Sequence, residues 1–381
     1  MSSVSKTLAP PASLPQDARA LIARVDLGRL VQNLHAMEKV SKGLGLLAVV
    51  KADAYGHGAV QVARALEAEG VAGYCVATLS EALELRHEGI SSPILVFGSI
   101  RPESLPMAAV HGIDLTVVSE GHLLELSELV PQHPVGLHLK LDTGMGRSGL
   151  RISELGGCID TIRRLQPWLR GVMGHFAAAE EPDTRFTQVQ RSRFLGGLAQ
   201  LRDAGITVSQ VHHANSAGCL RGFTEGDTHV RCGISLYGLS DLDEARQAGL
   251  RPILELSAEV FRSVLIPAGT TVGYGCTYVA PHPVRLVTLN CGYADGFSRA
   301  LANRAWAGFR GATYPVVGQV SMDSLTVVVP ESVNIRMGES MVLLSREPKD
   351  PHSVASTARL LGTIPYEITC ALNRRVARDH A

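Results

Sequence analysis

The sequence predicts an α/β fold, a TIM-like (β/α)8 barrel followed by a mostly β C-terminal domain. Eight short apolar runs recur between Leu46 and Gly238, and amphipathic segments such as 61–70 and 80–89 separate several of them. The runs are continuous rather than alternating, which is typical of strands buried on both faces of a parallel sheet. After about Asp241 the pattern changes to short strands punctuated by Gly and Pro. A doubly wound sheet is the alternative that this periodicity leaves open.

The first 240 residues divide into a tail and a barrel. Residues 1–18 are rich in Ser and Pro and lack the apolar stretch of a secretory signal, so they predict a flexible tail. The barrel domain is predicted over 19–240, and a strand at 19–27 belongs either to the barrel or to the sheet of the second domain. The eight barrel strands are predicted at 46–50, 73–77, 94–98, 114–118, 136–141, 169–176, 209–215 and 229–238.

The second domain is predicted over 241–381. The stretch Ser353–Leu361 has helical character and is expected to pack on this domain. Its strand runs lie at 253–266, 283–292, 312–319, 324–330 and 341–345.

The composition excludes several classes of protein. Lys+Arg and Asp+Glu total 36 each, so the net charge is zero and no basic field exists to bind nucleic acid or an anionic membrane. The longest nearly unbroken apolar run, Leu44–Val50, has seven residues, where a membrane span needs about 20. The seven cysteines are far apart and include no CxxC pair, which argues against a disulfide framework or a zinc site. A soluble protein of the reducing cytoplasm, without a metal, is predicted.

Polar residues follow the predicted barrel strands at the point where each strand ends. In a barrel of this type, chemistry is located at that C-terminal rim. The polar residues found there are Lys51, Lys140, Asp142, His175, Asn215, Ser216 and Arg231.

Lys51 follows five apolar residues and opens KADAYGHG, a turn containing Gly. Such a lysine either caps its strand in a salt bridge or, because desolvation lowers its pKa, provides an amine that forms a Schiff base with a carbonyl compound. Tyr55, four residues later, is either a packed loop tyrosine or a ligand for a cofactor phosphate.

Several motifs together resemble the alanine racemases, a family of enzymes that depend on pyridoxal 5'-phosphate (PLP). AVVKADAYGHG resembles the family's cofactor-lysine motif. The resemblance extends from about Ala20 to the C-terminus, and it implies a barrel followed by a β domain. The other motifs occur in the family's order and are KLDTGMGRSG, MGHFA, HANSAG, VRCGISLYGL, GYGCTY, CGYADGF and VSMDSL.

The resemblance assigns cofactor contacts to the barrel. Lys51 would carry PLP, and Arg231 would donate a hydrogen bond to the pyridine nitrogen without protonating it, which makes the ring a weaker electron sink. Ser216 otherwise reads as a plain helix cap, and His175 as a satisfied core histidine. The full set of cofactor-binding residues implied is Lys51, Tyr55, His175, Asn215, Ser216, Arg231, Gly233 and Ile234.

KLDTGMGRSG also matches the dinucleotide fingerprint GxGxxG, but no acidic residue follows about 20 positions later. By resemblance, Arg147 binds the substrate carboxylate. Lys140 matches a lysine that many relatives carbamylate with carbon dioxide to orient this arginine. An ordinary surface pair between Lys140 and Asp142 is the alternative.

GYGCTY places Tyr274 between Gly273 and Gly275, which permit an exposed, tight backbone. A tyrosine there is usually a packing residue, and with a pKa near 10 it needs a cationic neighbour to act as a base. By resemblance, a chain from Arg231 through His175 reaches Tyr274, the second catalytic residue beside Lys51.

The remaining family motifs place more substrate contacts in the second domain. Tyr293 would lie at the substrate entrance, with Met322 and Asp323 near the substrate. Arg374 stands where many members carry a phosphate-binding tyrosine, and Ala377 replaces the usual proline. Phosphate contact at 374 is therefore open, because an arginine there either binds phosphate or points outward from a basic tail.

The expected function is two-base racemisation of L- and D-alanine, which supplies D-alanine for peptidoglycan, by a homodimer with shared active sites. A PLP-dependent decarboxylase of the same architecture is the alternative enzyme, and a non-catalytic PLP carrier is the alternative from another class. The decarboxylase is expected to have a cysteine acid and a Gly-rich phosphate loop, which are not found in that family's context. The second domain, with GYGCTY and VSMDSL, argues against the carrier.

Overall fold

The computed structural model describes residues 20–381, so the predicted tail at 1–18 lies outside the described residues. The chain divides into two compact units, which are considered separately. One contains Arg24–Glu255, Ser345–Asn373 and Arg378–Ala381, and is called the barrel unit below. The other contains Leu256–Leu344, Arg374–Ala377 and, before Arg24, residues 20–23, and is called the β unit.

The barrel unit is built on eight parallel strands that form a ring, which confirms the predicted barrel over the doubly wound sheet. Hydrogen bonds from Thr228 N to Val211 O (2.8 Å) and from Arg231 N to Ala214 O (3.0 Å) close the ring. In ring order the strands are β10 (His229–Cys232), β2 (Gly45–Val49), β3 (Gly73–Val76), β4 (Ile94–Val96), β5 (Ile113–Val117), β6 (Leu137–Asp142), β8 (Leu169–Met173) and β9 (Gln210–His212).

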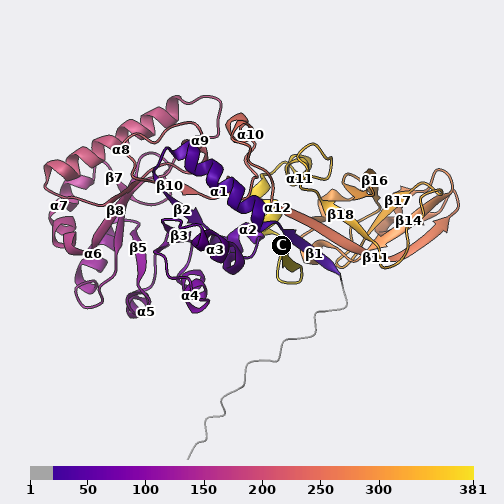
Figure 1. Ribbon diagram of the computed structural model, residues 1–381, viewed down its shortest axis with the longest axis horizontal. Coiled ribbons are helices and arrows are strands. Elements are labelled where there is room, and N and C mark those ends of the chain that lie inside the picture. The colour runs from indigo at the N-terminus through magenta and orange to yellow at the C-terminus, as the bar shows by residue number, and fades with distance from the viewer. Residues whose placement is uncertain (1–19) are drawn as a thin grey trace, which may run out of the picture. The chain divides into compact units, whose positions relative to one another are not determined.

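Helices lie on the outside of these strands (Figure 1). Their starts follow local rules, since Asp26 caps the first helix and Thr78 with Glu81 forms a capping box at α4. The helices that follow the strands are α2 (Lys51–Gly56) and α3 (Ala59–Ala68), α4 (Leu79–His87), α5 (Leu105–Val110), α6 (Glu120–Leu129), α7 (Leu155–Arg164), α8 (Arg185–Asp203), α9 (Ser216–Leu220) and α10 (Asp243–Gln247), with α1 (Leu27–Ser41) before β2 and the short β7 (Leu150–Arg151) beside β6.

Helices α11 (Val354–Leu361) and α12 (Pro365–Cys370) group with the barrel unit, whereas the sequence pattern places this stretch with the second domain. The reason is a close approach of backbones. At Gly56 in α2 an added Cβ would lie 2.1 Å from the carbonyl oxygen of Thr369 in α12, so only glycine allows the two helices to pack together.

The β unit contains the main part of an eight-stranded sheet whose strand pairs are antiparallel where register is defined. Strand β1 (Leu21–Val25) lies beside β11 in this sheet rather than in the barrel. A buried apolar cluster that includes Ile266, Leu286 and Val328 forms part of the core. The strands in sheet order are β14 (Val284–Leu289), β17 (Leu325–Val329), β16 (Ala312–Val317), β15 (Trp306–Phe309), β18 (Ser340–Leu344), β11 (Leu254–Ile266), β1 and β19 (Ala377–His380), and β12 (Thr271–Val272) pairs with β13 (Tyr278–Val279).

Within residues 20–381, no helix combines the length and apolar character that a membrane crossing requires. No cluster of His, Cys, Asp and Glu in the same residues is arranged to hold a metal ion.

Asn33 of α1 links the barrel to the segment that follows its last strand, and this link can be tested. Its buried amide donates to Leu236 O (2.9 Å) and Arg251 O (2.8 Å) and accepts from Arg251 N (3.0 Å). Asn33→Ala leaves these backbone groups without their partner, so the free energy of unfolding in urea should fall by about 3 kcal/mol. Gln32→Ala, at the exposed neighbouring position, should change it by less than about 0.5 kcal/mol. Equal losses in the two variants would contradict this account.

Candidate functional site

The barrel unit contains a cavity of about 580 Å3 at the C-terminal ends of its strands. Its wall combines apolar side chains with several cationic ones and the carboxyl groups of Glu180 and Glu181. The structure brings together all the site residues predicted in the barrel, which are Lys51, Tyr55, Lys140, Arg147, His175, Asn215, Ser216, Arg231, Gly233 and Ile234.

Lys51 begins an unusual turn directly after β2. Residues Ala52 to Tyr55 all have left-handed backbone angles, with φ between 52° and 54°. For L-residues other than glycine each such conformation costs about 1–2 kcal/mol, so four in succession require strong support from their surroundings. The sequence predicts a turn here and gives no signal of its handedness.

Hydrogen bonds fix this left-handed turn from several sides. Glu81 of α4 accepts from Ala52 N (2.8 Å), and Asp53 accepts from Ala59 N (2.8 Å). The ring of His57 bonds Ala54 O (2.8 Å). The turn therefore holds Lys51 at the strand end, where burial, and next the charge of Arg147, lower the pKa of its amine.

Arg231 lies in β10, and its guanidinium is buried among neutral acceptors. One terminal nitrogen donates to Nδ1 of His212 (2.9 Å) and to the carbonyl of the same residue. The other donates to Gly174 O (2.7 Å), His175 Nδ1 (3.1 Å) and His213 O (3.2 Å). Because arginine only donates, both ring Nδ1 atoms are acceptors and both rings are neutral. Burial and Arg231 lower the pKa of His175 and His212 well below the usual range.

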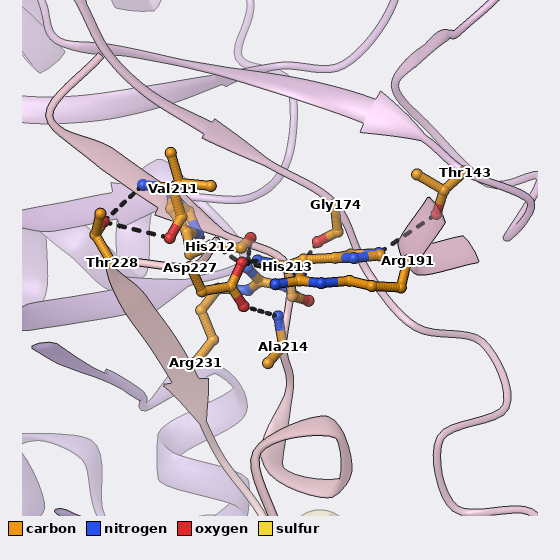
Figure 2. A network of polar contacts seen from close by, with 10 residues as sticks. All are labelled: Thr143, Gly174, Arg191, Val211, His212, His213, Ala214, Asp227, Thr228 and Arg231. Carbon is orange, nitrogen blue, oxygen red and sulfur yellow. Dashed lines mark hydrogen bonds and ion pairs between the residues drawn. The ribbon is translucent and has the colours of Figure 1, made fainter. Parts of the chain in front are cut away.

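An ion pair holds the segment that supplies these acceptors (Figure 2). Asp227, which is buried, accepts from His213 N and Ala214 N (3.0 Å each) and from Arg191 of α8 (3.0 Å). The same segment continues into Ser216. Asp227 and Arg191 therefore fix the backbone at the end of β9, which includes the His213 carbonyl that accepts from Arg231.

Gln190, next to Arg191 in α8, fixes the backbone that follows β8. Its amide donates to His175 O (3.1 Å) and to Thr143 Oγ1 (3.1 Å), and its oxygen accepts from Ala177 N (2.9 Å). Gln190, Arg191 and Asp227 were not predicted from the sequence, because buried polar residues on a long helix and in a loop carry no motif.

Lys140 and Arg147 provide further positive charge. Lys140 is buried and donates to Ser148 Oγ (2.6 Å), while Asp142 accepts from the backbone N–H groups of Gly144, Met145 and Gly146. These contacts rule out the ordinary surface pair between Lys140 and Asp142. Burial, with the charges of Arg147 and Arg231, lowers the pKa of Lys140 to about 8.

One end of the cavity is built for close approach to the backbone. Ser216 Oγ accepts from Gly233 N and from Ser235 Oγ (3.0 Å each), so its own O–H is available as a donor. At Gly233 an added Cβ would lie 2.6 Å from Tyr55 Oη. Tyr366 of α12 lies beside Tyr55, with ring centroids 5.5 Å apart, and lines the same cavity. Asn215 lines the cavity too and caps α9 through Gly218 N (2.9 Å).

Tyr366 is a residue that the sequence analysis did not identify. Arg374, considered there as a phosphate ligand, is an exposed residue of the β unit. The apolar spacing around α12 could have suggested a buried helix, but it does not show which helix face meets the barrel.

The site residues predicted in the β unit lie in three segments outside its long strands. Tyr274 is 71% exposed between Gly273 (φ 74°) and Gly275 (φ 71°), the tight, exposed backbone that the glycines predict. Elsewhere in the unit, Tyr293 N donates to Ser321 O (3.1 Å), and an added Cβ at Gly292 would lie 2.3 Å from Met322 O.

Asp323 is held by an arginine in the same unit. Arg375 bonds Asp323 (2.6 Å) and contacts the buried Asp295 (3.1 Å). The β unit therefore brings Tyr293, Met322 and Asp323 together. Each of these positions was predicted in the second domain.

The fold and the cavity define a barrel enzyme whose strand ends carry a desolvated lysine, a fixed arginine and a glycine-walled recess. Two family models match the chain, "Alanine racemase, N-terminal domain" over residues 25–241 and "Alanine racemase, C-terminal domain" over 253–380. The chain belongs to the alanine racemase family.

Individual relatives agree with this assignment. The alanine racemase of Symbiobacterium thermophilum is 38% identical over 93% of this chain and 96% of its own length, and alanine racemase 2 of Bacillus subtilis is 34% identical over 94% of each. Among solved structures, the alanine racemase of Streptomyces coelicolor has a TM-score of 0.89 at 30% identity, covering 95% of this chain and 98% of that one. That of Bacillus anthracis, determined with bound L-Ala-P, has a TM-score of 0.86 at 34% identity, covering 95% of each.

The neutral histidines of the barrel predict a loss of stability in acid. Burial lowers the pKa of His57 to about 4 and that of His213 to about 2, from 6.5. Below pH 6.5 these histidines bind protons in the unfolded chain but remain neutral in the folded protein. Their contribution to stability is therefore complete above pH 6.5 and is lost as the pH falls toward their pKa values in the folded protein. Each such histidine should lower the unfolding free energy by about 1.4 kcal/mol per pH unit.

Urea unfolding at several pH values between 7 and 5 measures this slope. His213→Gln should reduce it, and the same change at exposed His282 is the control. Unfolding free energies that do not change over this range would contradict the assignment of neutral buried imidazoles.

Proposed function

We propose that this enzyme interconverts L- and D-alanine with PLP bound in the barrel cavity, using Lys51 and Tyr274 as the two bases. The observation that carries the proposal is the position of Lys51. A desolvated amine at a strand end faces a cavity that also contains a buried arginine and a recess floored by Gly233. Family membership, shown by matches over both domains, favours alanine as the substrate.

The residues present fit PLP. Gly233 lines the cavity without a side chain, and the Tyr55 hydroxyl lies close to where its Cβ would be, so backbone and hydroxyl donors can surround a phosphate there. Ser216 provides an O–H with no competing use of its proton, and Tyr55 adds a phenol at the same end. Four cationic groups, Lys51, Lys140, Arg147 and Arg231, line the cavity and favour an anionic cofactor and substrate.

Each of these residues then has a defined task. Ser216, Gly233, Ile234 and Tyr55 would hold the phosphate, with Tyr366 at the same end of the cavity. Lys51 would hold the carbonyl group. When bound, PLP supplies a conjugated ring that stabilises negative charge on the carbon next to the amine.

Arg231 would face the ring nitrogen as a donor that does not give up its proton. His175 accepts from Arg231 through Nδ1, so its proton is on Nε2 and is available to a further partner. Asn215 lines the same cavity.

Arg147 and Lys140 would receive the substrate carboxylate. A planar guanidinium is suited to a carboxylate because it donates two parallel hydrogen bonds. With a pKa of about 8, a fraction of Lys140 is a neutral amine near pH 7, and the neutral form is the one that combines with carbon dioxide. Carbamylated Lys140 would be an anion able to orient Arg147.

Inversion at a carbon requires proton donors on opposite faces of the plane. Lys51 provides one from the barrel, and Tyr274 provides the other from its exposed, glycine-flanked position in the β unit. Tyr293, Met322 and Asp323 would border the substrate's path.

We further propose a homodimer in which Tyr274 of each subunit serves its partner's site. Supply of D-alanine for peptidoglycan in the cytoplasm is the proposed role.

Borohydride trapping tests the assignment of Lys51. Reduction of the PLP-loaded protein followed by peptide mapping should place a pyridoxyl group on Lys51, because its desolvated amine lies at the end of β2, in the turn that also carries Tyr55 beside Gly233. The pyridoxyl label should persist on Lys51 in Lys140→Gln, and the Lys51→Ala protein should not be labelled. A label on Lys140 in the parent protein would overturn the assignment.

Tyr274→Phe tests the two-base mechanism. Removing the phenol should slow racemisation at least about 10²-fold, the usual contribution of a positioned acid or base. Lys51 remains, so the α-proton of D-alanine should still exchange with deuterated solvent, as followed by NMR. Tyr278→Phe, in the neighbouring strand β13, is the matched control and should racemise at the parent rate. Unchanged racemisation in Tyr274→Phe would mean that the second base is another residue.

Subunit mixing tests the shared site. Lys51→Ala and Tyr274→Ala are each expected to be inactive, but exchanged heterodimers contain one site with both bases. Activity should therefore reappear as exchange proceeds, measured by D-alanine formed after partial denaturation and refolding of the mixture. Exchange shown by mass spectrometry without any recovery would place each site within a single chain.

A further inference from the structure

A row of polar side chains crosses the interior of the barrel below Arg231. Nδ1 of His212 accepts from Arg231 (2.9 Å), and Nε2 of His212 lies 2.8 Å from Nδ1 of His138. Nε2 of His138 in turn lies 3.6 Å from a carboxylate oxygen of Asp114. The two imidazoles are buried, at 0% and 2% exposed, and they meet edge to face with centroids 5.0 Å apart.

The arginine at one end determines where every proton in this row must be. Arg231 can only donate, so Nδ1 of His212 carries no proton and its single proton is on Nε2. That proton is donated to Nδ1 of His138, which must then be bare. The proton of His138 is therefore on Nε2, facing Asp114. The opposite direction would require His212 with no ring proton, an imidazolate, so only one arrangement satisfies the contacts.

The barrel is shaped to hold these side chains in this row. At Gly171 in β8 an added Cβ would lie 2.4 Å from Nδ1 of His138, and at Gly136 one would lie 2.1 Å from a carboxylate oxygen of Asp114. Both glycines leave space that the row occupies. Asp114 also contacts Arg170 (3.4 Å), and both line a second cavity, of about 420 Å3, at the N-terminal ends of the strands.

We propose that Asp114, His138 and His212 are positioning residues for Arg231. They keep Nδ1 of His212 as a permanent acceptor, which prevents the guanidinium from turning away from the strand ends. Without His138, the Nε2–H of His212 loses its acceptor, so the ring is no longer held in place and the hydrogen bond from Arg231 to its Nδ1 is weakened. The catalytic consequence rests on the proposed function of Arg231 toward the cofactor.

The protonation pattern can be measured on the unaltered PLP-loaded protein. Nitrogen NMR of protein labelled with 15N-histidine distinguishes bare from protonated ring nitrogens, and His138→Asn and His212→Asn assign the signals. Both rings should be neutral with the proton on Nε2. A proton on Nδ1 of either ring, or a doubly protonated ring, would overturn the proposal. This measurement does not use substrate, so it stands even if alanine is not racemised.

A pair of variants tests the effect on Arg231. The oxygen of Asn takes the place of the imidazole Nδ1, so His138→Asn should keep kcat within about threefold. His138→Leu removes the acceptor and should lower kcat about tenfold, shift the visible absorbance of bound PLP and move the ring 15N signals of His212. His352→Leu replaces another buried histidine, outside the barrel strands, and should do none of these. Equal effects of His138→Asn and His138→Leu, or a parent-like spectrum in both, would refute a positioning role.

Discussion

The buried charge of Arg231 is the constraint on which the site depends. A guanidinium that cannot lose its proton is placed inside a barrel, and it donates to backbone carbonyls and neutral imidazoles. Those acceptors must be held in place, because the loss of any one would leave part of a buried charge without its hydrogen bond. The fixed segments at the ends of β8 and β9 meet that requirement.

The helices outside the barrel hold these segments. Gln190 and Arg191 are neighbours in α8, and one fixes the His175 segment while the other, through Asp227, fixes the His213 segment. The left-handed turn after Lys51 depends on its surroundings in the same way, since Glu81 and Asp53 hold backbone groups that would not adopt this conformation alone. The strained turn and the buried charge are both stabilised by the hydrogen bonds that surround them.

Much of the fold was predictable because burial on both faces leaves a continuous apolar signature. All eight barrel strands overlap the predicted runs, and the change of pattern after Asp241 precedes the antiparallel strands. The barrel residues of the site were predictable because strand ends converge on one rim. The sequence alone therefore places Lys51 and Arg231 near each other. The other features depend on contacts distant in sequence. The left-handed angles of Ala52 to Tyr55, the position of Tyr366 and the row from Arg231 to Asp114 leave no local pattern.

We infer that this cavity converts one alanine enantiomer into the other and that Arg231, a donor that keeps its proton, limits the chemistry to that reaction. The most direct measurement is a chiral assay of the purified, PLP-loaded protein with each enantiomer, in which pyruvate is measured in the same samples. The account predicts the same equal mixture from L- and D-alanine, with no pyruvate above the protein-free control. No interconversion, or pyruvate accumulating together with it, would contradict the account.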